Sequence, residues 1–174
     1  LPSRFGIGTF SKEAYAFVDF LKEAGQKLWQ ILPLGPTGYG DSPYQAFSTF
    51  AGNPYLIDLE ELIENGWLTE EECENTDWGG SKSYVDYEKM YQGRFPEAIR
   101  RCRHELSDEI CFWQFLQYLF AKQWQALKAY ANGKGISIIG DIPIYVALDS
   151  ADTWSHPELF QLSEGCVPKA VAGV

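Results

Sequence analysis

Several side chains able to hydrogen bond a ligand stand close together in the stretch GYGDSPYQ. Tyr39, Ser42, Tyr44 and Gln45 supply two phenols, a hydroxyl and an amide there. These groups donate and accept hydrogen bonds, so they can fix the orientation of a polar molecule. Glycines and prolines around them permit tight turns and restrict the backbone, which favours a preorganised loop. The alternative interpretation is a rigid packing loop whose rings belong to the core.

A second stretch, GDIPIYVALDSADTW, carries three carboxylates. Asp141 follows an apolar run, and at the carboxyl end of a strand its side chain would point toward a pocket. It has two open roles, ligand contact or acceptance of main-chain N–H groups. Asp149 and Asp152 suggest a carboxylate pair, but Asp149 or Ser150 is better placed to cap a short helix leading to Trp154.

Histidines and cysteines give little sign of further chemistry. His156 has no visible acid or serine partner and is interpreted as a surface or packing residue, while His104 lies on a solvated helix face. Cysteine spacing is unsuited to zinc or to redox chemistry, so free thiols in a cytoplasmic protein and no metal are expected. The cysteines are Cys73, Cys102, Cys111 and Cys166.

Composition excludes several classes of partner. The net charge of −10 leaves no basic face for nucleic acid and disfavours anionic membranes. No apolar run is long enough to span a bilayer. Hydrophobic residues make up 45% of the chain, which is enough for a packed core.

Local patterns predict the elements that position these residues. A helix should begin at Ser11 and end at Gly25, followed by the strand KLWQILPL, ended by Pro33. DLEELIENGW should form a short helix ending at Gly66, and Thr69 should cap another. The GYGDSPYQ loop would therefore follow the carboxyl end of a strand.

A long helix is predicted over residues 107–132, capped by Ser107 and ended by Gly133. Its apolar residues cover more than one stripe, so we expect it to be mostly buried. Its rings and those beside the loop are interpreted as core, not as a ligand-binding surface. These are Phe112, Trp113, Phe115, Phe120 and Trp124 on the helix, and Phe47, Phe50 and Tyr55 near the loop.

After this helix, GISIIGDIPIYVAL is nearly all apolar and β-branched, as expected of a parallel strand covered on both faces. Strand, helical excursion and strand again indicate βαβ organisation and an α/β fold. Both polar loops then follow the carboxyl ends of strands, where such folds place their active sites.

Five stretches together resemble a known family. LPSRFGIG, LWQILPLGPTGYGDSPYQ, FAGNPYLIDL, FLQYLFAKQW and IIGDIPIYVALDSADTW occur in this order. They are similar to the 4-α-glucanotransferases, the amylomaltases or disproportionating enzymes of the α-amylase superfamily. The block from Leu34 to Gln45 is the most specific of them.

The resemblance implies an incomplete (β/α)8 TIM barrel with an inserted, mainly helical subdomain, of which this chain is the N-terminal part. Residues 1–58 would hold early barrel strands and the glucan-groove loop, and residues 59–106 the inserted subdomain. Residues 107–174 would hold the long barrel helix, the next parallel strand and its loop. Relatives carry a longer insertion near MYQGRFPEAIRR, so residues 92–96 would mark a deletion or a splice.

The implied activity is transfer of α-1,4-glucan segments between maltooligosaccharides by a retaining double displacement. Two carboxyl groups about 5 Å apart suffice for it, so no cofactor is expected. In the family these are an Asp nucleophile and a Glu acid/base, with a third Asp, and none of their motifs occurs in this sequence. We therefore expect no catalytic residue here, and 174 residues that are inactive alone.

Substrate-binding residues are carried over by position. Ser42 and Tyr44 would touch sugars near the scissile bond, and Tyr39 would lie in a second glucan groove. Asp141 would lie on the donor side of the cleavage point, and Gln45 would contact sugar or support the loop. Alternatives are a non-catalytic glucan-binding fragment, a truncated product without a stable fold, and a hydrolase of the same superfamily.

Overall fold

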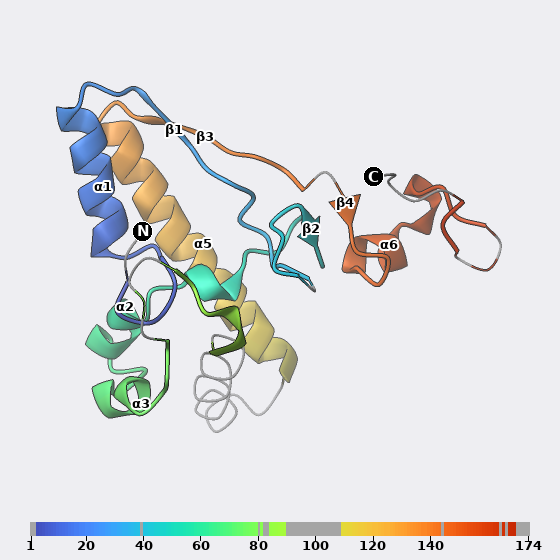
Figure 1. Cartoon of the computed structure of the whole chain (residues 1–174), viewed down its shortest axis with the longest axis horizontal. Coiled ribbons are helices and arrows are strands. Elements are labelled where there is room, and N and C mark those ends of the chain that lie inside the picture. Colours follow the sequence, from blue (N-terminus) through green and yellow to red (C-terminus); the bar gives the residue numbers. More distant parts are fainter. Residues whose placement is uncertain are drawn as a thin grey trace. The chain divides into compact units, whose positions relative to one another are not determined.

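The computed structural model describes residues 3–38, 40–79, 81, 84–89, 109–143, 145–163, 165 and 167–169. The chain divides into two compact units, one of Leu1–Ile31 with Gly52–Ile139 and the other of Leu32–Ala51 with Gly140–Val174. Figure 1 shows the elements, which are α1 (Lys12–Glu23), β1 (Leu28–Gln30), β2 (Gln45–Ala46), η1 (Pro54–Leu56), α2 (Leu59–Glu64), α3 (Glu70–Glu74), α5 (Glu109–Gly133), β3 (Ser137–Ile139), β4 (Tyr145–Val146), α6 (Ala151–Ser155) and η2 (Pro157–Leu159).

Helix α1 begins and ends where the sequence predicts. Ser11 takes the N-cap position in extended backbone, although its hydroxyl donates to Glu13 Oε2 at 2.7 Å and caps no main-chain N–H. At the other end Gly25 has φ 71°, the left-handed conformation that ends many helices. The face toward the core buries Ala14, Val18 and Leu21.

Helix α5 ends one residue later than expected, and the glycine that terminates it is Gly135 instead of Gly133. Gly133 is still helical, and the chain turns at Gly135, which has φ 79°. Main-chain hydrogen bonds at this turn have the pattern of a Schellman motif, in which a glycine in the left-handed conformation follows the helix. Ser107, the expected cap, lies outside the described residues.

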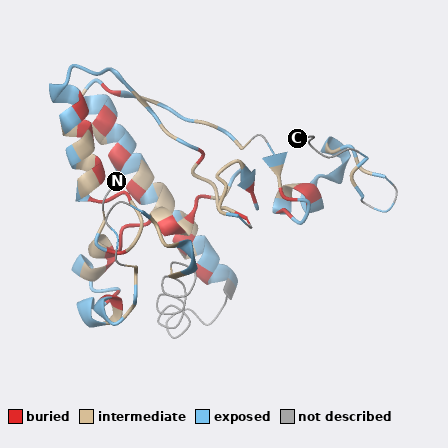
Figure 2. Ribbon diagram, viewed as in Figure 1, coloured by how far each residue is buried: buried red, intermediate tan, exposed pale blue. Residues whose placement is uncertain are grey.

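One face of α5 is buried in the described part of the chain, as Figure 2 shows. The expectation of burial on more than one stripe is therefore wrong for the described residues, because they bury mainly the face that packs against the rest of the first unit. Trp113 is 44% exposed and Tyr118 is 59% exposed. The buried residues recur every three or four positions, namely Phe112, Leu116, Leu119, Gln123, Leu127 and Ala131.

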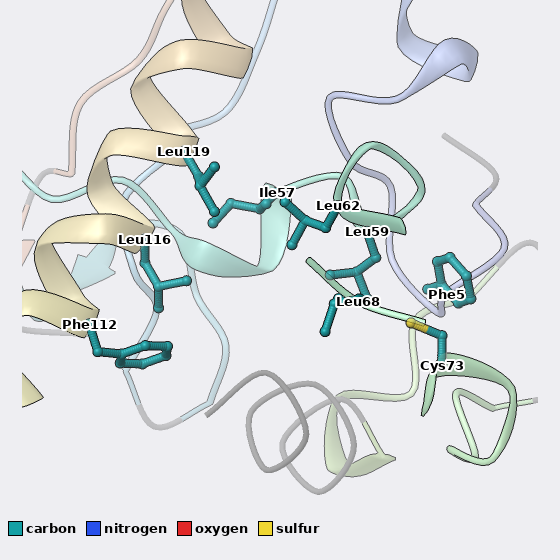
Figure 3. Close-up of a cluster of buried hydrophobic side chains, with 9 residues drawn as sticks. All are labelled: Phe5, Ile57, Leu59, Leu62, Leu68, Cys73, Phe112, Leu116 and Leu119. Carbon is teal, nitrogen blue, oxygen red and sulfur yellow. The ribbon is translucent and has the colours of Figure 1, made fainter. Parts of the chain in front are cut away.

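The N-terminal half of α5 packs into a cluster of buried side chains (Figure 3). Two short helices supply the other side, and α2 is terminated by Gly66 (φ 72°) and α3 is capped by Thr69, both as predicted. Asp58 accepts a main-chain N–H at the start of α2, and Thr69 forms a capping box with Glu72 at the start of α3. The cluster consists of Phe5, Ile57, Leu59, Leu62, Leu68, Cys73, Phe112, Leu116 and Leu119.

The strands form two parallel pairs, β1 with β3 and β2 with β4. The predicted parallel arrangement is thus confirmed, but GISIIGDIPIYVAL is not one strand covered on both faces. It divides into β3 and β4, which pair in different sheets, and Ile139 is 44% exposed. Gly140 and Pro143 stand between them, and proline cannot donate to a ladder.

The described residues therefore form a mixed α/β structure in which the strands do not close a barrel. The division into residues 1–58, 59–106 and 107–174 stays a prediction. Among the helices that the structure describes, none has both the length and the apolar character needed to cross a membrane. Cys73 is buried and Cys111 is exposed, and neither forms a disulfide among the described residues, whereas Cys102 and Cys166 lie outside them.

Candidate functional site

The GYGDSPYQ loop is the end of a hairpin in the second unit. Gly38 N–H donates to the carbonyl of Gln45 at 3.1 Å, and Phe47 N–H donates to the carbonyl of Pro36 at 3.3 Å. Between these bonds Thr37 and Ala46 form an antiparallel bridge. Because Ala46 also belongs to β2, the hairpin is held to β4 as well.

The tip of the hairpin contains a tight turn at Ser42–Pro43–Tyr44–Gln45. Gln45 N–H donates to Ser42 O at 3.2 Å, and proline in the second position has the φ that such turns require. Ser42 Oγ accepts the N–H of Tyr44 at 3.3 Å. Among the described residues the Ser42 O–H finds no acceptor, so the turn leaves its proton available to a ligand.

Tyr44 and Asp141, which are 97 positions apart, are brought together in this unit. Tyr44 Oη donates to Asp141 Oδ2 at 3.0 Å, and Asp141 Oδ1 accepts the N–H of Ile142 at 2.8 Å. The hydrogen bond to Asp141 is the main cause that raises the pKa of the Tyr44 phenol, with burial and the carboxylate charge adding to it. Asp141 is thus at least a structural acceptor, one of the two roles that the sequence left open.

The Tyr44–Asp141 pair can still accept hydrogen bonds from a ligand. Tyr44 has one phenolic proton and gives it to Asp141, so a further partner of Oη has to be a donor. Each Asp141 oxygen also retains a lone pair. Together with the O–H of Ser42, the site can therefore accept protons from ligand hydroxyls and donate one in return.

The other residues predicted to act in or near this loop have different surroundings. Gln45 holds the hairpin through its main chain, and its side chain is exposed. Tyr39 lies outside the described residues. Tyr55 is buried as expected, but Phe50 is 92% exposed and Phe47 is 44% exposed. The packing interpretation is therefore wrong for Phe50, because no described side chain covers its ring.

The aspartates of DSADTW do not act as a pair. Ser150 caps α6, its Oγ accepting the N–H of Thr153 at 3.1 Å, and Asp149 is exposed. Asp152 binds Thr49 with both oxygens, accepting the main-chain N–H at 3.0 Å and the hydroxyl at 2.6 Å. Sequence reasoning missed this contact, since no local pattern signals a bond between residues 103 apart.

His156 is exposed as expected, but it does have an acidic neighbour. Its Nδ1 lies 3.1 Å from Glu158 Oε1. The pKa of Glu158 is lowered, first by its own main-chain N–H and then by His156. Within the residues that the structure describes, no group of three or more His, Cys, Asp or Glu side chains is arranged to hold a metal ion. His104 lies outside them.

A comparison with protein families identifies the group to which the chain is related. The model of glycoside hydrolase family 77, 4-alpha-glucanotransferase, matches residues 1–96 and residues 79–174. The chain belongs to this family. The resemblance noted in the motifs is therefore confirmed.

Members of the 4-alpha-glucanotransferase family match nearly the whole chain. The Clostridium butyricum enzyme is 40% identical over 98% of the chain, and the Thermus thermophilus enzyme is 39% identical over all of it. The structure of amylomaltase from Streptococcus agalactiae in complex with acarbose matches all of the chain with a TM-score of 0.90 and 38% identity. The chain covers 49%, 46% and 47% of these proteins, so it spans about half their length.

Length also differs inside the matched region. The alignment with the Clostridium relative runs over 237 positions, more than the 174 residues of the chain. That relative therefore carries residues within the span that have no counterpart here. Both segments of the family match include residues 79–96, which agrees with the deletion or splice expected at residues 92–96.

Proposed function

We propose that this chain is the part of a 4-α-glucanotransferase that holds the glucan, in an enzyme that moves α-1,4-glucan segments between maltooligosaccharides. Family membership supports the reaction class. The observation on the chain itself that carries the proposal is the bond between Tyr44 and Asp141 at 3.0 Å. It joins two motifs of the family and presents acceptors to sugar hydroxyls.

The reaction proposed is a retaining double displacement. One carboxylate attacks the anomeric carbon while an acid protonates the leaving oxygen, and the 4-hydroxyl of a second sugar then displaces the enzyme from the covalent intermediate. The carboxyl pair is expected outside these 174 residues. The chain's own residues bind and orient the glucan, with Ser42 donating to it and the Tyr44–Asp141 pair accepting from it.

Two further residues belong to the proposal. Tyr39 is assigned to a second glucan groove and Gln45 to the edge of the first, both on the basis of their positions in the family motif. The complex of the Streptococcus agalactiae relative with acarbose supports a saccharide as the ligand class.

Intact mass and an assay with maltotriose test the activity. A sample at the 19.7 kDa of this chain should bind maltotriose or acarbose without converting maltotriose. A heavier protein that contains the carboxyl pair should give glucose and longer oligosaccharides. Shorter sugars only would show a hydrolase, and an unchanged trisaccharide with the heavier protein would refute the transferase.

Binding by the 174-residue chain can be tested at single residues. Tyr44→Phe removes the hydroxyl that joins the pair, and we expect the Kd for acarbose to rise about tenfold, the scale of one hydrogen bond to a charged group. Tyr118→Phe is the matched control, since Tyr118 is exposed on α5 in the other unit. Equal affinities of the two variants would refute the assigned role of Tyr44.

The alternative is a non-catalytic glucan-binding fragment. It is favoured by the Tyr44–Asp141 pair, because binding a saccharide needs only hydrogen-bonding groups of this kind. Acarbose binding with no transfer, at the mass of this chain and after addition of acceptor sugars, would support it.

A further inference from the structure

The segment that follows the GYGDSPYQ hairpin is attached to α6 by a bidentate contact. Thr49 donates both its main-chain N–H and its hydroxyl to the two oxygens of Asp152, at 3.0 and 2.6 Å. Hydrogen bonds to a carboxylate are stronger than those between neutral groups. Because both donors belong to one residue, the contact restrains the main chain and the side chain of Thr49 together.

Asp152 makes this contact from a rigid base. It lies in the first turn of α6, between the buried residues Ser150 and Thr153. Ser150 Oγ accepts the N–H of Thr153, and Thr153 Oγ1 donates to the carbonyl of Ala147 at 3.2 Å. The first turn of α6 is therefore held to the end of β4 by buried polar contacts, and a carboxylate fixed there can hold a neighbouring loop.

Among the described residues, main-chain hydrogen bonds to the 140–174 segment reach the hairpin as far as Phe47. The N–H groups of Tyr145, Ala147 and Ala151 donate to the carbonyls of residues 44, 46 and 47, respectively. Beyond Phe47, residues 48–51 are connected to the described part of the 140–174 segment by the two hydrogen bonds between Thr49 and Asp152. These bonds therefore fix the far end of a segment that begins with the turn at Ser42–Gln45.

We propose that Asp152 is a positioning residue that, through Thr49, fixes residues 45–49 and so keeps Tyr44 in place to bind glucan. The glucan part of this statement rests on the proposed function. Asp152 itself touches no ligand in this scheme. Its role is to limit the motion of the hairpin, so that the glucan meets a loop that is already ordered.

Amide hydrogen exchange of the full 174-residue chain measures the positioning without any ligand. Asp152→Asn keeps the shape but loses one acceptor, and Thr49→Val keeps the shape but loses the hydroxyl. In both variants, we expect amide exchange at position 49 and at Gln45, corrected for intrinsic rates, to accelerate about tenfold. Gln45 is the critical probe, because its N–H bonds to Ser42 O inside the turn and not to Asp152.

Affinity for acarbose is the second measurement. Asp152→Asn and Thr49→Val should raise the Kd about three- to tenfold, since part of the binding free energy is then used to order the loop. Thr49→Ser keeps both donors and should stay within about twofold of the parent chain. Asp149→Asn removes the same charge three residues earlier, at an exposed position, and serves as the control for charge.

The outcomes separate the two proposals. Unchanged exchange at Thr49, or acceleration confined to Thr49 with Gln45 unaffected, would overturn the positioning role. Acceleration at both amides with unchanged acarbose affinity would also overturn it. If the parent chain binds neither acarbose nor maltotriose, the proposed function fails, and exchange at Gln45 still decides whether Asp152 orders the turn.

Discussion

An added methyl group at Gly52 in the first unit should be strongly destabilising. A Cβ there would overlap the Cγ, Cδ1 and Cε1 atoms of the Phe120 ring. The backbone of Gly52 cannot retreat, because its N–H and its carbonyl both bind the side-chain amide of Gln117, at 2.8 and 2.9 Å. The Phe120 ring, which packs edge-on against Phe10 with centroids 5.2 Å apart, therefore has to move.

Two costs add up when Gly52→Ala displaces that ring. Overpacking of this kind costs about 1–3 kcal/mol, and the loss of an aromatic pair costs about 0.5–1.5 kcal/mol more. We expect the free energy of unfolding to fall by about 2–4 kcal/mol. Urea unfolding followed by circular dichroism and tryptophan fluorescence measures it, provided that the m-value stays constant.

Gly133→Ala is the matched control for this substitution. Gly133 lies in the last turn of α5, and an added Cβ would meet no atom within 4 Å. It should therefore be neutral or stabilise the chain by about 0.5–1 kcal/mol through helix propensity. On a Phe120→Ala background the cost of Gly52→Ala should nearly vanish. A full cost on that background, or a change below about 0.5 kcal/mol on the parent chain, would refute the steric explanation.

Three other perturbations have defined outcomes. Gln123→Leu removes the side-chain oxygen that accepts the buried main-chain N–H of Asp58, and it should lower the free energy of unfolding, measured in urea, by about 1–3 kcal/mol. Hydrogen bonds from Lys134 and then Tyr130 lower the pKa of Asp19. The ionised Asp19 therefore stabilises the fold above about pH 4, and this stabilisation is lost as the pH falls further. Asp19→Asn should make Tm depend less on pH in the acid range, and an unchanged dependence of Tm on pH would contradict this explanation. Because Asp141 raises the pKa of Tyr44, an absorbance titration should show this phenol ionising above the ordinary tyrosine range, and Asp141→Asn should move it down.

Features with a local signal in the sequence were predictable. The N-cap at Ser11, the capping box that begins at Thr69 and the cap of α6 at Ser150 each depend on residues within four positions. The choice between Gly133 and Gly135 as the end of α5 was not local in this sense. Both glycines suit a helix terminus, and what distinguishes them is which one adopts positive φ when Ile136 is buried.

The geometry of the candidate site could not be predicted from the sequence. The resemblance to the family assigned Ser42, Tyr44 and Asp141 to one site, and the structure shows a hydrogen bond between Tyr44 and Asp141. The bond from Thr49 to Asp152 had no signal, because it depends on where the hairpin meets α6. The exposure of the Phe50 side chain could not be predicted either, because the residue type alone does not determine whether other side chains of the fold cover the ring.

The connections from α1 to β1 and from α5 to β3 in the first unit limit how this chain can change in length during evolution. Gly25 stands just before β1 and Gly135 just before β3, and Ser137 N–H donates to the carbonyl of Lys27 at 2.8 Å between the two connections. Side chains alternate along a strand, so one residue gained or lost between Gly135 and Ser137 would exchange the two faces of β3. Insertions that distinguish longer relatives therefore have to be accommodated in other connections, where an added residue shifts no strand pairing.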